Sequence, residues 1–99
     1  MAQFDVYRPT GHKMLAVDCQ HKFLSHLQTR FVMPLIPVGP DTPEATRLNP
    51  RVAVGDEDFV LMANGAATVP TSILGKAIAS VSDEQEAIKR ALDLLITGF

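Results

Sequence analysis

Residues 82–95 read SDEQEAIKRALDLL, the stretch of this chain with the clearest helical periodicity. Ser82 followed by Gln85 matches a capping box, in which the serine hydroxyl accepts the Gln85 N–H. Apolar residues recur along the segment at helical spacing and predict one buried stripe: Ile88, Ala91, Leu92 and Leu95. We therefore expect a helix that begins at Ser82 and packs against the residues before it.

The residues upstream of this helix are expected to form short strands. Alternation and apolar runs predict strands over residues 3–7, 14–19, 30–36, 51–54 and 59–62, with one or two more over residues 69–78. Pro34 has no N–H to donate, so we expect an edge or a bulge there. Strands followed by one helix, without βαβ alternation, predict a mainly β fold: a small antiparallel barrel with the helix against it. The 99 residues make one domain, 1–99.

Three connections stand out. Residues 55–58 are expected to form a four-residue hairpin loop. Residues 37–50 carry four prolines and predict a long loop that is either mobile or functional. Residues 20–29 contain the apolar pair Phe23-Leu24, flanked by polar residues, for which a cap on the barrel is the simplest interpretation.

The composition excludes several classes of protein. A net charge of -2 argues against a strongly basic nucleic-acid surface. Cys19 is the single cysteine, so no internal disulfide forms, which is typical of a reducing compartment. We see neither a basic and apolar leader nor an apolar run long enough to span a bilayer. We therefore expect a cytoplasmic protein without a membrane partner.

The side chains that carry chemistry do not form a recognisable active site. Cys19 follows Asp18 in a strand and is expected to be a small buried hydrophobe. The acidic residues 56–58 lack the ligand spacing of a calcium loop and are expected at a solvated tip. Three histidines lack the spacing of a metal pair and are expected on the surface: His12, His21 and His26. We predict no catalytic residue, no metal and no cofactor.

The segment after the stripe, LLITGF at residues 94–99, is apolar and completes the predicted helix with a glycine and an aromatic residue. Gly98 suits the left-handed position just past a helix end. An apolar tip at a fixed place can pack into the core, form a dimer contact or insert into a partner. Phe99 folding back onto the last turn is an equally good interpretation of the residues alone.

Motifs along the whole chain resemble those of the CcdB family, the toxins of type II toxin–antitoxin modules that poison DNA gyrase. The resemblance rests on several segments in the same order, closed by Gly98: QFDVY (3–7), VDCQ (17–20), RFVMPL (30–35), GDEDF (55–59), VPTSILG (69–75) and IKRALDLL (88–95).

The resemblance implies a homodimer of SH3-like antiparallel barrels of the CcdB/MazF/Kid type, each with a small three-stranded wing and a C-terminal α-helix. It implies binding to the dimerisation arm of the gyrase A subunit, which traps the enzyme on cleaved DNA. The family's gyrase-contacting positions correspond here to Phe23, Leu24, Asp93, Ile96, Thr97, Gly98 and Phe99. The family ends in Trp-Gly-Ile, whereas this chain ends in Thr97-Gly98-Phe99. Loss of a buried tryptophan costs on the order of 2 kcal/mol or more of affinity.

The resemblance also implies a cognate CcdA-like antitoxin whose disordered segment folds on the toxin and removes it from gyrase. The complex represses its own operon, and operator DNA is contacted mainly by the antitoxin. The acidic balance of this chain agrees with that division of roles. The residues do not assign the antitoxin-binding positions.

Two other functions stay open at the level of sequence. A MazF/Kid-like endoribonuclease shares the barrel fold, and Arg8, Thr10 and His12 have side chains able to cleave RNA by acid–base catalysis. However, the opening Phe4-Asp5-Val6-Tyr7 lacks the basic, glycine-containing segment of those enzymes. The other alternative is a divergent homologue that dimerises and binds an antitoxin without poisoning gyrase.

Overall fold

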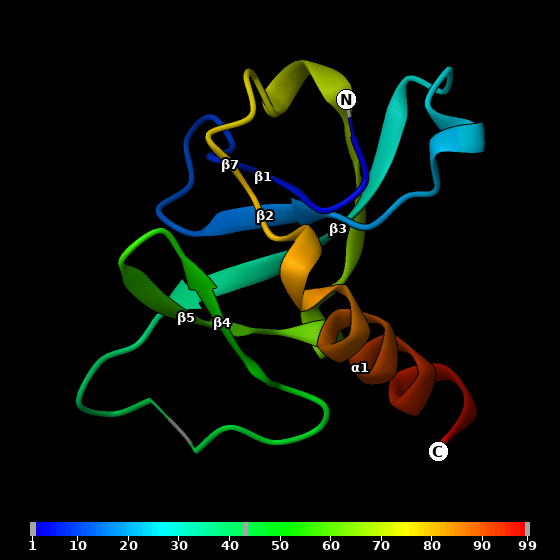
Figure 1. Cartoon of the computed structure of the whole chain (residues 1–99). Coiled ribbons are helices and arrows are strands. Elements are labelled where there is room, and N and C mark those ends of the chain that lie inside the picture. The colour runs from blue at the N-terminus through cyan, green and yellow to red at the C-terminus, as the bar shows by residue number, and fades with distance from the viewer. Residues whose placement is uncertain (1, 43, 99) are drawn as a thin grey trace.

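The computed structural model describes residues 2–42 and 44–98. Within that part of the chain, antiparallel strands form one seven-stranded sheet that curls into a nearly closed barrel, and one α-helix, α1 (Gln85–Thr97), follows it (Figure 1). The strands are β1 (Asp5–Tyr7), β2 (Leu15–Asp18), β3 (Thr29–Pro37), β4 (Arg51–Val54), β5 (Glu57–Leu61), β6 (Ala67–Pro70) and β7 (Ala79–Ser80). The predicted mainly β fold is confirmed.

The sheet runs in the order β4-β5-β3-β2-β1-β7, with β6 also paired to β3. The first strand, β1, pairs with the last strand, β7: Asp5 lies opposite Ser80 and Val6 opposite Ala79. The first strand of the barrel is therefore held in place by the last.

The central strand, β3, accommodates Pro34 by changing partners. One side of β3 pairs with β2 at residues 32–35 without interruption. The other side pairs with β6 at residues 29–32 and with β5 at residues 35–37. A 3-10 turn, η2 (Ala63–Gly65), separates β5 from β6 beside Pro34, whose carbonyl accepts the Met62 N–H at 2.9 Å. The missing proline N–H faces this interruption, because N–H and C=O of one strand residue point the same way. Of the two predicted alternatives, an edge or a bulge, the edge is wrong because β3 is an interior strand, and Pro34 lies instead at a local interruption of the ladder.

Two strand boundaries differ from prediction because of positive φ angles. β1 begins at Asp5 rather than Gln3, since Phe4 has φ 70, a left-handed conformation that is uncommon for an aromatic residue. Burial of the Phe4 ring, which is 5% exposed, offsets that strain. The β4–β5 loop has two residues, 55–56, instead of four, because Gly55 at φ 61 permits a tight turn between paired Val54 and Glu57.

The prediction of one or two strands over residues 69–78 is confirmed only for residues 69–70 and is wrong for the rest of the segment. β6 ends at Pro70, a second 3-10 turn, η3 (Thr71–Ile73), follows, and the last strand occupies only residues 79–80. The Thr71 N–H donates to the Gln28 carbonyl at 2.9 Å and the Leu74 N–H to the Thr71 carbonyl, so the backbone turns immediately after the proline. Apolar composition alone did not distinguish this turn from a strand.

The helix begins without the predicted capping box. Residues Ser82–Glu84 form a 3-10 turn, η4, in which the Gln85 N–H donates to the backbone carbonyl of Ser82 rather than to its hydroxyl. Within the described part of the chain, α1 begins at Gln85 without a side-chain cap. The Gln85 side chain instead accepts from Lys89 Nζ at 3.3 Å.

The predicted stripe is buried only over its first part. Ile88 and Ala91 are 1% and 0% exposed and join the barrel core, where α1 contacts η2. Leu92 is half-buried, but Leu95 is 43% exposed, so its predicted burial was wrong. The helix thus leaves the barrel surface before it ends, and its last turn lies in solvent.

Candidate functional site

The connection between β2 and β3 carries an exposed aromatic turn, η1 (Lys22–Leu24), called here the η1 knuckle. Phe23 is 78% exposed and Leu24 46%, so neither caps the barrel core. Leu27, which was not predicted as a site residue, is 42% exposed a few residues further on. Exposed apolar side chains this close together are typical of an interaction surface.

The knuckle is capped by His21. Its Nδ1 accepts the Phe23 N–H at 3.1 Å, and its backbone carbonyl accepts the Leu24 N–H at 2.9 Å. The His21 and Phe23 ring centroids lie 4.6 Å apart. His21 is on the surface, as expected, but it satisfies a backbone donor at the start of the turn, and its spacing gave no sign of that role.

Gln20 joins the knuckle to the barrel. Its side-chain Nε2 donates to the Leu24 carbonyl at 2.9 Å, and its Oε1 accepts the Phe31 N–H at 2.9 Å. Its backbone N–H donates to Asp18 Oδ1 at 3.0 Å. Gln20 is buried, with 9% exposure, and sequence reasoning missed it because polar residues in a connection are ordinarily solvated.

Behind Gln20 lies a buried ion pair between Asp18 and Arg30. Arg30 Nε donates to Asp18 Oδ2 at 2.9 Å, and Arg30 Nη2 lies 2.6 Å from the same oxygen without hydrogen-bond geometry. Both side chains are 0% exposed, and among the described residues Arg30 Nη1 has no acceptor. Neither residue was singled out in sequence, since only the β2–β3 register brings them together.

The last turn of α1 carries the other predicted contact residues. Ile96 is 70% exposed, and Asp93, Thr97 and Gly98 are exposed beside it. Thr97 Oγ1 donates to the Asp93 carbonyl at 2.7 Å, so its hydroxyl is turned back onto the helix. Gly98 has φ 81 and its N–H donates to the Leu94 carbonyl at 3.0 Å, which confirms the left-handed helix end. Phe99 lies outside the described residues.

One protomer does not bring the two predicted contact segments together. Figure 1 shows the η1 knuckle at the upper right, beside the upper end of β3, while α1 ends well below it at the lower right. Phe23 and Leu24 therefore belong to a different surface from Ile96 and Thr97 within a single chain. A continuous contact surface that uses both segments requires either a large partner or a second copy of the chain.

Cys19 is half-buried among core residues, which agrees with the interpretation as a small hydrophobe. Burial, and then the negative charge of Asp18, raise the pKa of its thiol to about 12 from an ordinary 9.0. The thiolate, not the thiol, is the nucleophile, so Cys19 is unreactive near neutral pH.

We expect native Cys19 to be alkylated by iodoacetamide at pH 8 at least about a hundredfold more slowly than in urea, because its thiolate fraction is lower. The folded pKa lies above the unfolded one, so this group's contribution to stability is present below pH 9.0 and is lost as pH rises toward about 12. Cys19→Ala should remove that part of the alkaline destabilisation in urea titrations. Equal native and unfolded alkylation rates would contradict the buried thiol.

The remaining chemistry-bearing side chains stay dispersed in the described part of the chain. Arg8, Thr10 and His12 lie in one exposed turn between β1 and β2, fastened by the Thr10 N–H to the Ile73 carbonyl at 2.9 Å. Within residues 2–42 and 44–98, no three histidine, cysteine or acidic side chains come close enough to hold a metal ion.

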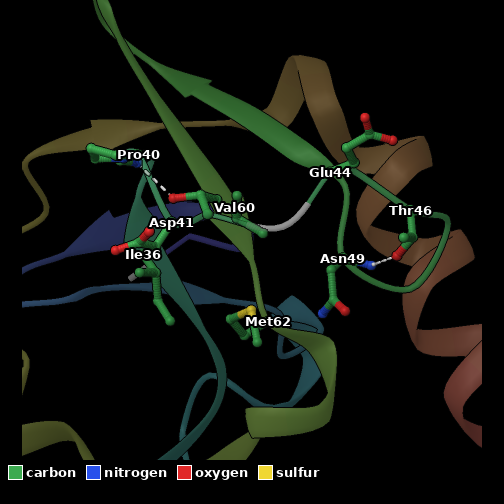
Figure 2. A pocket seen from close by; sticks show the side chains of 10 residues that line it. Ile36, Pro40, Asp41, Glu44, Thr46, Asn49, Val60 and Met62 are labelled. Atoms are coloured by element: carbon green, nitrogen blue, oxygen red, sulfur yellow. Dashed lines mark hydrogen bonds between the residues drawn. The ribbon is translucent and has the colours of Figure 1, made fainter.

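The segment between β3 and β4 borders a cleft of about 460 Å³ (Figure 2). Ile36 and Val60 line it from the sheet and Met62 from the residue after β5, while Asp41 and Glu44 lie on opposite sides of the opening in Figure 2. Asn49 fixes one wall by donating to the Leu61 carbonyl at 3.2 Å and to Asn64 Oδ1 at 3.3 Å. The cleft therefore combines apolar side chains along one wall with two carboxylates at its opening.

The sequence model of one family, described as CcdB protein, matches residues 3–98. The match covers nearly the whole chain and includes both the η1 knuckle and the last turn of α1. None of the helices in the described part of the chain combines the length and the apolar character that crossing a lipid bilayer requires.

Proposed function

The chain belongs to the CcdB family of toxin–antitoxin toxins, and we propose that its target is DNA gyrase. In this proposal a homodimer binds the dimerisation arm of the gyrase A subunit and traps the enzyme on cleaved DNA. A cognate CcdA-like antitoxin removes it, and operator DNA is bound through the toxin–antitoxin complex. The toxin acts as an inhibitor rather than as an enzyme, and it acts in the cytoplasm.

The observation that carries the proposal is the exposure of Ile96, 70%, on the last turn of a helix whose earlier turns are buried. An apolar side chain fixed on a rigid element can enter a partner's pocket at low entropic cost. Gly98 in its left-handed conformation ends the helix at a defined place, so the tip has one direction. The exposed Phe23 supplies a second anchor.

A homodimer fits the separation of these two surfaces. A two-fold dimer that places its α1 ends together presents a self-complementary surface, which matches a two-fold partner such as the gyrase arm. The exposed face of Leu95, 43%, would be covered either by the second copy or by the target. Leu95, which was predicted from the sequence to be buried, is therefore included in the proposed contact surface of the helix tip.

Thr97 favours one alternative, a homologue that binds an antitoxin without poisoning gyrase. Its hydroxyl is engaged by the Asp93 carbonyl, leaving only a methyl group for a partner where the family has a tryptophan. Without a tryptophan at position 97, the binding energy of the tip depends on Ile96, on the exposed part of Leu95, and on Phe99, which lies outside the described residues. We expect weaker but measurable poisoning.

The test is a DNA-cleavage assay with purified gyrase, ATP and the protein. We expect linear cleaved DNA to accumulate with protein concentration, and a variant lacking Gly98 and Phe99 to lose this effect. Cleavage that is unchanged by the truncation would refute the role of the tip. No cleavage from an intact dimer would favour the binding-only homologue, and RNA cleavage lost in His12→Ala would favour a ribonuclease.

A further inference from the structure

We propose that Gln20 and His21 are positioning residues that hold the η1 knuckle in its binding conformation before gyrase is met. The inference rests on the proposed function, because it concerns how Phe23 and Leu24 are presented to that target. Gln20 is buried and offers a partner almost no surface, whereas His21 is exposed and is assigned its role through the hydrogen bond to the Phe23 N–H.

The first step is that burial does not hold the knuckle. None of its three residues is buried, and Phe23 is 78% exposed. An exposed apolar turn gains little from the hydrophobic effect in the free protein, so its order must come from polar contacts. Without them, the turn would have to be ordered on binding, which weakens affinity.

The second step is that one side chain connects the knuckle to the barrel. Among the described residues, Gln20 Nε2 on the Leu24 carbonyl is the single hydrogen bond between residues 21–27 and the chain outside them. Gln20 itself is fixed at two further points, by the Phe31 N–H and by Asp18 Oδ1, which Arg30 holds in turn. The knuckle is therefore tied to the buried ion pair through Gln20.

The third step is that His21 sets the conformation of the turn itself. Its Nδ1 satisfies the Phe23 N–H, and its ring lies against the Phe23 ring at 4.6 Å. These contacts orient the most exposed aromatic side chain of the region. If only a fraction of molecules had the turn formed, the apparent dissociation constant would rise by the inverse of that fraction.

The experiment measures binding to the intact gyrase A subunit by surface plasmon resonance. His21→Ala should weaken affinity about five- to tenfold, and His21→Asn, whose side-chain oxygen can accept the same N–H, should stay within about twofold of the wild type. His26→Ala, at an exposed position of the same connection, is the matched control and should not change affinity. The melting temperatures of the two His21 variants should agree. A difference in gyrase affinity between these variants could then not be explained by a difference in their stability.

Gln20→Glu keeps an acceptor for the Phe31 N–H but removes the donor to the Leu24 carbonyl. We expect affinity to fall about tenfold or more. Gln3→Glu is the control, since Gln3 Nε2 donates to the Cys19 carbonyl at 3.1 Å without touching the knuckle. Amide exchange at Phe23 should accelerate in His21→Ala and not in His21→Asn.

The outcomes separate the two proposals. If Phe23→Ala loses affinity while His21→Ala and Gln20→Glu bind like the wild type, positioning is overturned and the knuckle contact stands. If the wild type does not bind gyrase A at all, the proposed function is overturned, and the inference with it. Should Gln20→Glu fail to fold, the exposed His21 pair still decides the question.

Discussion

Replacing Asp18 with alanine is expected to lower the free energy of unfolding by about 3–5 kcal/mol. The substitution leaves the Arg30 guanidinium charged and unpaired at a position with 0% exposure, and it removes the acceptor of the Gln20 N–H. The total free energy of unfolding of a domain of this size is roughly 5–15 kcal/mol. Asp18→Ala should therefore remove a large part of the stability and lower the melting temperature by about 15 °C or more.

Urea denaturation at pH 7 measures this cost. Asp58→Ala, at an exposed aspartate on β5, is the matched control and should stay within about 0.5 kcal/mol of the wild type. The double variant Asp18→Leu/Arg30→Met removes both charges and should be more stable than Asp18→Ala. An Asp18→Ala midpoint equal to that of the wild type would show that the pair contributes nothing.

Ile96→Glu is expected to abolish gyrase poisoning while leaving the fold intact. A carboxylate in place of the exposed isoleucine must be desolvated on binding, and loss of a central apolar anchor costs about 3 kcal/mol, or about a hundredfold in affinity. Because Ile96 is 70% exposed, the free protein loses little packing, and a negative charge near the helix C-terminus costs less than about 1 kcal/mol. Affinity for gyrase A and the yield of linear DNA report the effect.

Ile78→Glu is the matched control, since Ile78 is 52% exposed and immediately precedes β7, a strand that Figure 1 shows away from the end of α1. This control also replaces an exposed isoleucine with a glutamate, and its gyrase affinity should stay within about twofold of that of the wild type. Equal losses in both variants would mean that added negative charge, rather than the helix tip, weakens binding. Full poisoning by Ile96→Glu would remove Ile96 from the contact surface.

Much of the fold could be predicted because periodicity and turn residues act locally. The strand alternation, the helix stripe through Ile88 and Ala91, and the left-handed Gly98 follow from such patterns. The errors arise where distant parts of the chain decide. Pro34 is tolerated in the interior strand β3 because β3 changes its partner from β6 to β5 at this position. The predicted side-chain cap by Ser82 is replaced by a backbone 3-10 turn.

The sequence predicted the exposed apolar residues of the candidate site but not the polar residues that support them. The family resemblance placed contact residues at Phe23 and Ile96, and both are exposed. It did not indicate Gln20, His21 or the Asp18–Arg30 pair, because hydrogen bonds between a strand end, a turn and a neighbouring strand have no fixed sequence spacing. Leu95 was misassigned because the stripe continues in sequence after the helix has passed the barrel.

The pairing of β1 with β7 has a consequence for how the protein is made. Val6 pairs with Val17 on one side, but the partners of β1 on its other side are Ala79 and Ser80, so a nascent chain cannot complete this pairing until β7 has left the ribosome. The helix that bears Ile96 is synthesised later still. Translation products that end before β7 therefore lack both the β1–β7 pairing and the helix tip, and we expect such fragments of the toxin to be inactive.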